Sequence, residues 1–160
     1  MALVPQVADA VKIPIIAAGG IADGRQLLAA FALGASGVQV GTCLLVSEEC
    51  PIHENYKKAI IEARDTDTTV TGRISGVPVR ILKNKMAREY VKREKEGADK
   101  AELEIEGDVD SGSLMAGQVA GMCNRILPVA RIIEDMFAGC KSANNKLSEE
   151  LSNSEGHVCI

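Results

Sequence analysis

The feature that most constrains the fold is a short apolar run that ends in two consecutive glycines. Residues 13–18 are apolar without alternation, which is the pattern of a strand covered on both faces, as in parallel sheets. Gly19 and Gly20 follow at once and permit a tight turn with no side chain to obstruct it. The run therefore predicts a buried strand whose carboxyl end leads into a glycine turn.

A helix and a second strand are predicted immediately after this turn. Asp23 can accept hydrogen bonds from the first turn of a helix, and Gln26, three residues later, completes a capping-box pattern. Gly34 is well placed to end that helix, and the β-prone run 37–42 follows. The strand, helix and strand span about 30 residues, the usual size of a right-handed βαβ crossover.

Elsewhere, helices are predicted wherever apolar residues recur at helical spacing. These segments are 4–11, 56–63, 79–90 and 126–137, the last ending near Gly139.

Three further segments have other signals. Residues 66–71 are β-prone and short. Residues 92–106 are charge-dense and are expected to be solvated helix or loop, and residues 107–112 form a turn-rich break. The polar tail from Ser142 is expected to fray.

Composition excludes several classes of function. Aromatic residues make up 2% of the 160 residues, with no Trp, so the core must be aliphatic, which suits an α/β fold. The net charge is −4, from 22 acidic and 18 basic residues. We therefore expect no nucleic-acid partner. No apolar run approaches the roughly 20 residues that span a bilayer, so no membrane association is expected either.

The cysteines favour a reducing compartment. There are 5, an odd number, at irregular spacings and without a Cys-x-x-Cys pair, so neither a disulfide framework nor a zinc site is predicted. Cys50 and His53 form the one ligand-like pair, and a second pair is lacking. Residues 1–11 lack the basic and apolar regions of a signal peptide. We expect a cytoplasmic location and no bound metal.

The two strand ends together predict an anion site. Gly19 and Gly20 end the first strand, and Gly41 and Thr42 end the second. Bare amides there can approach an anion closely, and a phosphate commonly sits between the last two strand ends of a (β/α)₈ barrel. Gln39 could hydrogen-bond a ligand from the second strand. The alternative is that these glycines only permit tight turns.

Seven stretches of the sequence resemble those of a known family. They are Val-Pro-Gln at 4–6, Ile-Pro-Ile-Ile-Ala-Ala-Gly-Gly-Ile-Ala-Asp-Gly at 13–24, Phe-Ala-Leu-Gly-Ala at 31–35, Val-Gln-Val-Gly-Thr at 38–42, His-Glu-Asn-Tyr-Lys at 53–57, Ala-Arg-Asp-Thr-Asp-Thr-Thr at 63–69, and Gly-Asp-Val-Asp-Ser-Gly-Ser-Leu-Met-Ala-Gly-Gln at 107–118. Together they resemble the nitronate monooxygenase (2-nitropropane dioxygenase) family. Within that family they most resemble the FMN-dependent enoyl-acyl-carrier-protein reductases.

The resemblance implies a cofactor and the residues that hold it. The cofactor is FMN, with NADH or NADPH as co-substrate. The residues implied to hold the FMN phosphate are Gly19, Gly20, Gln39, Val40, Gly41 and Thr42. Residues 115–118 are implied to fold back toward the flavin, although a packing turn explains them as well.

The resemblance also implies the architecture. The chain is expected to be α/β and to form the C-terminal part of a TIM (β/α)₈ barrel, an incomplete barrel that contains its last two strands. Residues 1–50 would be these βα units, residues 51–141 a mainly helical extension, and residues 142–160 a polar tail.

Three functions remain open on this basis. The first is reduction of a small-molecule or acyl-carrier-protein-bound enoyl thioester; the second is nitronate oxidation. The third is a non-catalytic, anion-binding half-barrel. No catalytic residue is predicted within this chain, because the family's catalytic histidine lies in a Gly-Gly-His segment that the sequence lacks. His53 and His157 do not occupy its position. A homodimer is one open oligomeric state.

Overall fold

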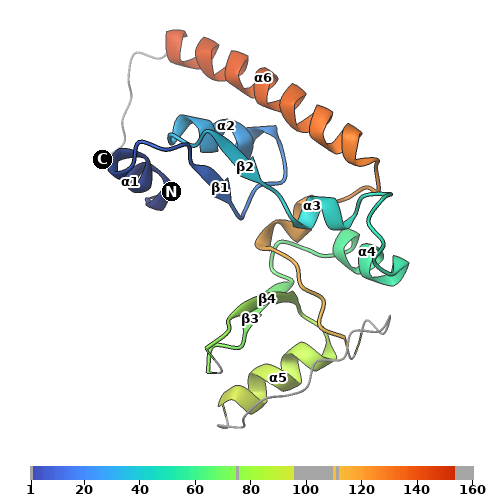
Figure 1. Ribbon diagram of the computed structural model, residues 1–160. Helices are drawn as coiled ribbons and strands as arrows, with labels where there is room; N and C mark the ends of the chain where they lie inside the picture. Colours follow the sequence, from blue (N-terminus) through green and yellow to red (C-terminus); the bar gives the residue numbers. More distant parts are fainter. Residues whose placement is uncertain (1, 75, 96–109, 111, 154–160) are drawn as a thin grey trace. The chain divides into compact units, whose positions relative to one another are not determined.

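The computed structural model describes residues 2–74, 76–95, 110 and 112–153 (Figure 1). Contacts divide the chain into two compact units. The first comprises Met1–Gln39 with Ala130–Ile160, and the second comprises Val40–Val129. The predicted division at residues 50 and 141 separates barrel units, a helical extension and a tail, whereas these units are defined by contacts alone. The predicted division therefore stays a prediction.

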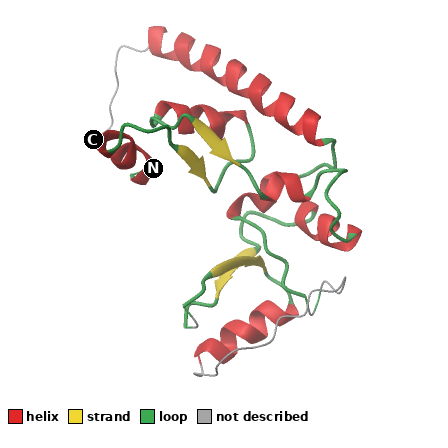
Figure 2. Cartoon of the chain, viewed as in Figure 1, coloured by secondary structure: helices red, strands yellow, loops and turns green. Residues whose placement is uncertain are grey.

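The first unit contains the predicted strand–helix–strand. Its elements are α1 (Leu3–Ala10), β1 (Ile16–Ala18), α2 (Gly24–Ala32), β2 (Gly37–Gln39) and all but the first residue of α6 (Val129–Asn153). Strands β1 and β2 pair in parallel, with Ile16 opposite Gly37 and Ala18 opposite Gln39. Helix α2 connects them (Figure 2). The α/β class, the two strands and the two helices of this region are confirmed.

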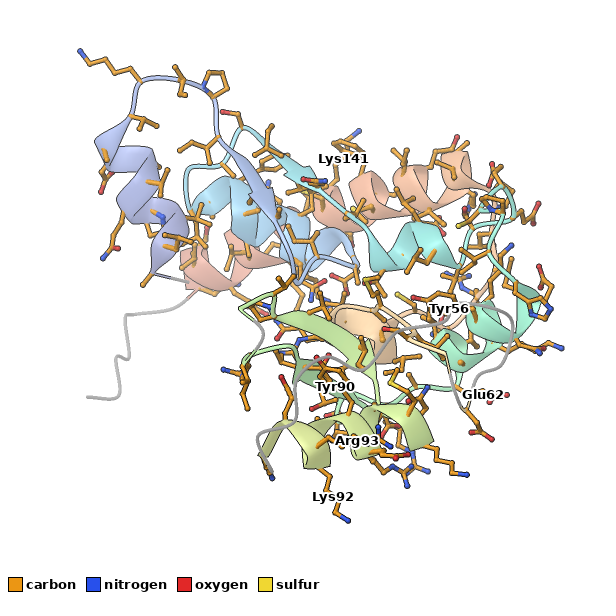
Figure 3. All side chains as sticks on the ribbon, turned by 60° about the horizontal axis from the view of Figure 1, so that its bottom comes forward. Tyr56, Glu62, Tyr90, Lys92, Arg93 and Lys141 are labelled. Atoms are coloured by element: carbon orange, nitrogen blue, oxygen red, sulfur yellow. The ribbon has the colours of Figure 1, made fainter. Side chains whose placement is uncertain are left out.

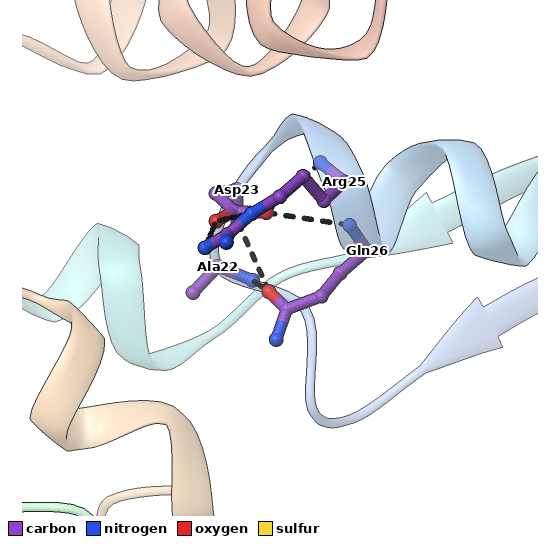
Figure 4. Close-up of polar contacts among 4 residues, drawn as sticks. All are labelled: Ala22, Asp23, Arg25 and Gln26. Carbon is purple, nitrogen blue, oxygen red and sulfur yellow. Dashed lines mark hydrogen bonds and ion pairs between the residues drawn. The ribbon is translucent and has the colours of Figure 1, made fainter. Parts of the chain in front are cut away.

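Helix α2 begins through the predicted capping box (Figure 4). The Asp23 carboxylate accepts from the backbone N–H of Arg25 at 2.9 Å and of Gln26 at 3.3 Å. In return, Gln26 Oε1 accepts from the N–H of Ala22 at 2.6 Å and of Asp23 at 3.1 Å. The sequence signal was sufficient here because every partner lies within four residues.

The predicted burial of β1 is wrong. Only Ala17 of this strand is buried, and Ile16 is 58% exposed. Within the described residues the sheet has two strands, so no neighbouring strand or second layer covers Ile16. The described part of the chain contains no closed barrel.

Helix α6 does not end near Gly139 but continues to Asn153, and the expected fraying from Ser142 is wrong for residues 142–153. Gly139 lies inside the helix at the place where α6 packs on α2, and a β-carbon on it would stand 3.4 Å from Gly24 Cα. Beyond it, Lys146 pairs with Glu150 at 3.7 Å, one helical turn away, a spacing that stabilises exposed helices modestly. The last part of the predicted tail, residues 154–160, lies outside the described residues.

The second unit is built around a hairpin. Its elements are α3 (Thr42–Leu45), α4 (Glu54–Ile61), β3 (Thr68–Thr71), β4 (Val79–Leu82), α5 (Lys85–Lys95) and the 3₁₀ helix η1 (Gln118–Met122). Strands β3 and β4 pair antiparallel, with Thr68 opposite Leu82. The segment after residue 112 then lies along the other edge of β4, because Leu82 donates to the Leu114 carbonyl at 2.8 Å. The predicted strand at 66–71 is confirmed.

The helix predicted over 79–90 is wrong in its first half. Residues 79–82 are a strand, and the helix begins at Lys85. Asn84 decides this boundary: its Oδ1 accepts from Ala87 N at 2.7 Å, and its Nδ2 donates to the Gly112 carbonyl at 2.7 Å. Residues 92–95 extend the helix as expected. The remainder of the predicted charged segment, 96–106, lies outside the described residues, as does most of the turn-rich break at 107–112.

Both units have aliphatic cores, as the composition predicts. Leu27 is 1% exposed in the first unit, and Ile60 and Ile81 are at most 1% exposed in the second.

The predicted second strand stops at Gln39, and Thr42 already belongs to α3. None of the helices in the described ranges is long and apolar enough to cross a lipid bilayer.

The contact between α2 and α6 generates a test of the first unit. A β-carbon on Gly24 would stand 2.1 Å from Cys140 N and 2.3 Å from the Gly139 carbonyl carbon. We expect Gly24→Ala to lower the free energy of unfolding in urea by about 2 kcal/mol or more, because backbone must move. Helix propensity alone would raise it by up to about 1 kcal/mol.

The matched control is Gly41→Ala. A β-carbon there meets nothing within 4 Å, so a change within about 0.5 kcal/mol is expected. A Gly24→Ala protein as stable as the wild type would contradict the observed packing.

Candidate functional site

The turn after β1 adopts a conformation that favours glycine. Gly19 has φ 95° and Gly20 has φ 75°, a left-handed region that residues with a β-carbon rarely enter. The turn by itself therefore explains both glycines. A β-carbon on Gly19 would meet nothing within 4 Å, so the turn also leaves open space beside its backbone.

The end of β2 lies beside the end of β1. Ala18 is opposite Gln39 in the parallel pair, so both strands leave the sheet at the same edge. Gln39 is exposed, which leaves its amide able to meet a ligand. Val40 follows it and is half-buried.

Gly41 differs from the other two glycines because nothing local requires it. Its φ is −118°, an ordinary value for any residue. A β-carbon at this position would meet no atom within 4 Å. Neither backbone strain nor packing within the described residues explains the missing side chain. Close approach of a ligand to the exposed backbone of Gly41 remains as a physical reason.

Thr42 is buried and hydrogen-bonded. Its Oγ1 accepts from the Gly117 N–H at 2.8 Å, and the hydroxyl keeps its own proton to donate to a further acceptor. The Thr42 side chain lies close to Gly117: a β-carbon on Gly117 would stand 3.0 Å from Thr42 Oγ1. Residues 115–118 therefore fold back against the start of α3.

The predicted cofactor residues are divided between the two units. Gly19, Gly20 and Gln39 belong to the first, and Val40, Gly41 and Thr42 belong to the second. The structure brings Gln39 beside the end of β1. That all six residues form one phosphate cradle stays a prediction.

The first turn of α2 is an unsuitable place for an anion. Its N–H groups at Arg25 and Gln26 already donate to Asp23. Burial alone would raise the pKa of the Asp23 carboxyl, but hydrogen bonds from Arg25 and from the two amides outweigh it and hold the pKa below its usual value. The charged carboxylate, which is also paired with the Arg25 guanidinium, already occupies these two amides, so an anion cannot use them. Donors for an anion must come from the preceding turn.

Tyr56 anchors the segment that reaches Thr42. This tyrosine lies on α4 (Figure 3), and its hydroxyl donates to the Met115 carbonyl. Ala116 N also donates to the Arg80 carbonyl at 3.2 Å. The Asn-Tyr-Lys motif was visible in the sequence, but its partner 59 residues away was not.

Lys57, the next residue, is a buried cation that sequence reasoning missed. Its side chain is 4% exposed, and its Nζ lies 3.3 Å from Glu54 Oε1, which is largely exposed. Burying this ammonium group costs desolvation free energy. The buried Lys57 side chain marks the face of α4 that packs inside the second unit.

The neighbouring histidine has a structural role. The Nδ1 atom of His53 accepts from Asn55 N at 3.1 Å and so caps α4. No group of three or more potential metal-ligating side chains occurs among the described residues. The Cys50–His53 pair therefore has no further ligand within this part of the chain.

Comparison with known proteins supplies the family. The family model described as nitronate monooxygenase matches residues 1–139. A probable nitronate monooxygenase of Staphylococcus saprophyticus is 51% identical over 84 residues, which cover 52% of this chain and 24% of that protein.

Two solved structures are also similar. The structure of FabK from Thermotoga maritima is 44% identical with a TM-score of 0.87, and the match covers 92% of this chain and 50% of that one. The nitroalkane oxidase of Streptomyces ansochromogenes is 32% identical with a TM-score of 0.73, covering 91% and 44%.

The α/β fold and these matches thus place the chain in a family of enzymes. The chain belongs to the nitronate monooxygenase family. It spans 24% of the curated relative and at most half of the two solved chains.

Tyr56 provides a test of the second unit. Burial raises its pKa from 10.0 to about 12, so the stabilisation from its protonated hydroxyl is complete below pH 10 and is lost as the pH rises through about 12. In a Tyr90→Phe variant Tyr56 is the only tyrosine. We expect the ultraviolet absorbance of its phenolate to develop with a midpoint near pH 12.

Unfolding in urea at neutral pH provides a second measurement. Tyr56→Phe should lower the free energy of unfolding by about 1 kcal/mol, because the Met115 carbonyl loses its donor. A Tyr56 titration midpoint near pH 10, the ordinary value, would show that the phenol is neither buried nor engaged.

Proposed function

We propose that this chain supplies the FMN-phosphate-binding part of a flavin-dependent enoyl-acyl-carrier-protein reductase. The observation that supports this most directly is the open backbone at the two strand ends. A β-carbon on Gly19 or Gly41 meets nothing within 4 Å, and at Gly41 no backbone strain demands glycine. These are the positions where the bare amides of a phosphate site would lie.

The available donors suit a phosphate monoester. Amides of the 19–20 turn and of Gly41 would point at its oxygens, and the Thr42 hydroxyl has a proton to donate. No Lys or Arg belongs to this set, so binding would rest on hydrogen bonds rather than ion pairs. When bound, FMN would supply the hydride chemistry between NADH or NADPH and the substrate. The residues of this chain would hold and orient it.

Similarity among the solved structures favours one substrate class. The likeness to FabK, an enoyl-acyl-carrier-protein reductase, covers 92% of this chain at 44% identity and a TM-score of 0.87. The likeness to nitroalkane oxidase covers 91% of this chain at 32% identity and a TM-score of 0.73. At nearly equal coverage the higher identity favours an enoyl thioester. Nitronate oxidation is the second candidate, because the probable nitronate monooxygenase is 51% identical over its 84 matched residues.

In this proposal β1 and β2 are neighbouring strands of a (β/α)₈ barrel. The remaining strands and the catalytic histidine come from outside these residues. A non-catalytic, anion-binding role for the chain alone is the third candidate. It is supported by the absence of a catalytic group from the residues assigned above.

Addition of FMN to the purified chain tests the proposal. We expect quenching of flavin fluorescence on binding, with a dissociation constant that rises on adding inorganic phosphate as competitor. NADH oxidation that depends on an enoyl thioester would favour the reductase, and oxygen uptake that depends on a nitronate would favour the second candidate. Binding without either activity is the result expected of the third. Failure to bind FMN would contradict the claim that these residues hold it.

Substitutions locate the phosphate. Gly41→Val should raise the FMN dissociation constant roughly tenfold or more without loss of thermal stability, because its side chain enters space that is otherwise open. Gly20→Val should do the same but also destabilise the turn, given φ 75°.

Asp23→Ala is the control for these substitutions. It removes a helix cap and should cost about 1 kcal/mol of stability, yet it should leave FMN affinity unchanged, because the Asp23 carboxylate contacts Arg25 and Gln26 rather than the residues assigned to the phosphate. Equal affinity in Gly41→Val and wild type would refute the placement of the phosphate beside Gly41.

A further inference from the structure

Two buried thiols meet beside the candidate site and take no part in the function proposed above. Cys43 is the second residue of α3, and Cys123 directly follows η1. Their sulfur atoms are 3.6 Å apart, although the residues are separated by 80 positions. Cys43 is 5% exposed and Cys123 7% exposed. Both belong to the second unit.

The contact has a direction. The Cys123 thiol donates to Cys43 Sγ, and Cys123 Sγ is also 3.6 Å from the Val119 carbonyl oxygen. The hydrogen bond to Cys43, together with burial, raises the pKa of the Cys123 thiol. Because the Cys43 sulfur accepts this hydrogen bond, it is the sulfur of the pair that is placed to act as the nucleophile.

We propose that Cys43 and Cys123 form a redox-active dithiol that closes to an intramolecular disulfide when the protein meets hydrogen peroxide. The sulfur atoms must approach by about 1.5 Å to reach the length of a disulfide bond. Rotation of the two side chains can supply much of that movement, because α3 and η1 already lie in contact.

The chemistry balances with peroxide as the oxidant. The Cys43 thiolate attacks one oxygen of hydrogen peroxide, the O–O bond breaks, and the other oxygen leaves as hydroxide. The Cys123 sulfur then attacks Cys43 Sγ, and the S–O bond breaks. The two thiol protons complete two molecules of water. Two thiols are oxidised by two electrons in total, and one peroxide is reduced.

The disulfide would fasten two segments that the candidate site uses. Cys43 is adjacent to Thr42, whose hydroxyl accepts from Gly117, and Cys123 ends the helix that starts at Gln118. A covalent link between α3 and η1 closes a long loop of chain. It thereby removes conformations from the unfolded state and raises stability.

The test uses a variant of the 160-residue chain that keeps only these two cysteines, Cys50→Ala/Cys140→Ala/Cys159→Ala. Thiols are titrated in denaturant before and after one equivalent of hydrogen peroxide, and the product is mapped by mass spectrometry. We expect two titratable thiols to fall to none, a mass loss of two hydrogen atoms, and one cross-linked peptide pair containing residues 43 and 123. The melting temperature should rise by roughly 5–10 °C and return on reduction with dithiothreitol.

Cys43→Ala and Cys123→Ala in that background are the controls. Each should keep one titratable thiol and show no rise in melting temperature with peroxide. The same cross-linked peptides should also form in the wild-type chain, which keeps the test valid if a variant folds poorly. Two thiols that survive peroxide, oxidation of each sulfur singly to a sulfinic acid, or a disulfide between chains would overturn the proposal. None of these measurements depends on FMN binding.

Discussion

The parallel pairing of β1 with β2 is the constraint on which the candidate site depends. Because Ala18 lies opposite Gln39, the chain leaves both strands at the same edge of the sheet. The connecting helix makes this possible, since its start is held by Asp23 and Gln26. A slip in the pairing would move Gln39 to another position along β1 and separate the two strand ends.

The glycines at these strand ends do not all have the same structural reason. Gly19 and Gly20 have positive φ, so the backbone alone accounts for them. Gly41 has an ordinary φ and open surroundings, so its lack of a side chain is informative about a ligand. The same reasoning moves the expected anion away from the first turn of α2, whose amides are already satisfied by an ionised carboxylate.

In the second unit, long-range contacts converge on the segment 112–123. Tyr56 holds the Met115 carbonyl, Thr42 holds the Gly117 amide, and Cys43 touches Cys123. Each contact joins α3 or α4 to a segment at least 59 residues later. The Thr42 hydroxyl and the neighbouring Cys43 thiol therefore both contact the same segment of the chain.

The sequence by itself determined the features whose partners are local. The capping box of α2, the strand–helix–strand and the β-strand near residue 68 follow from patterns within about 30 residues. The family resemblance follows from short motifs between residues 4 and 118. Tertiary structure decided the rest. Residues 79–82 became a strand because β3 and the 114–116 segment offered partners. Helix α6 continues through Gly139, where the backbone of Gly24 packs against it. A periodic pattern records which side chains are apolar, but only the packed chain decides which hydrogen-bond partners are within reach.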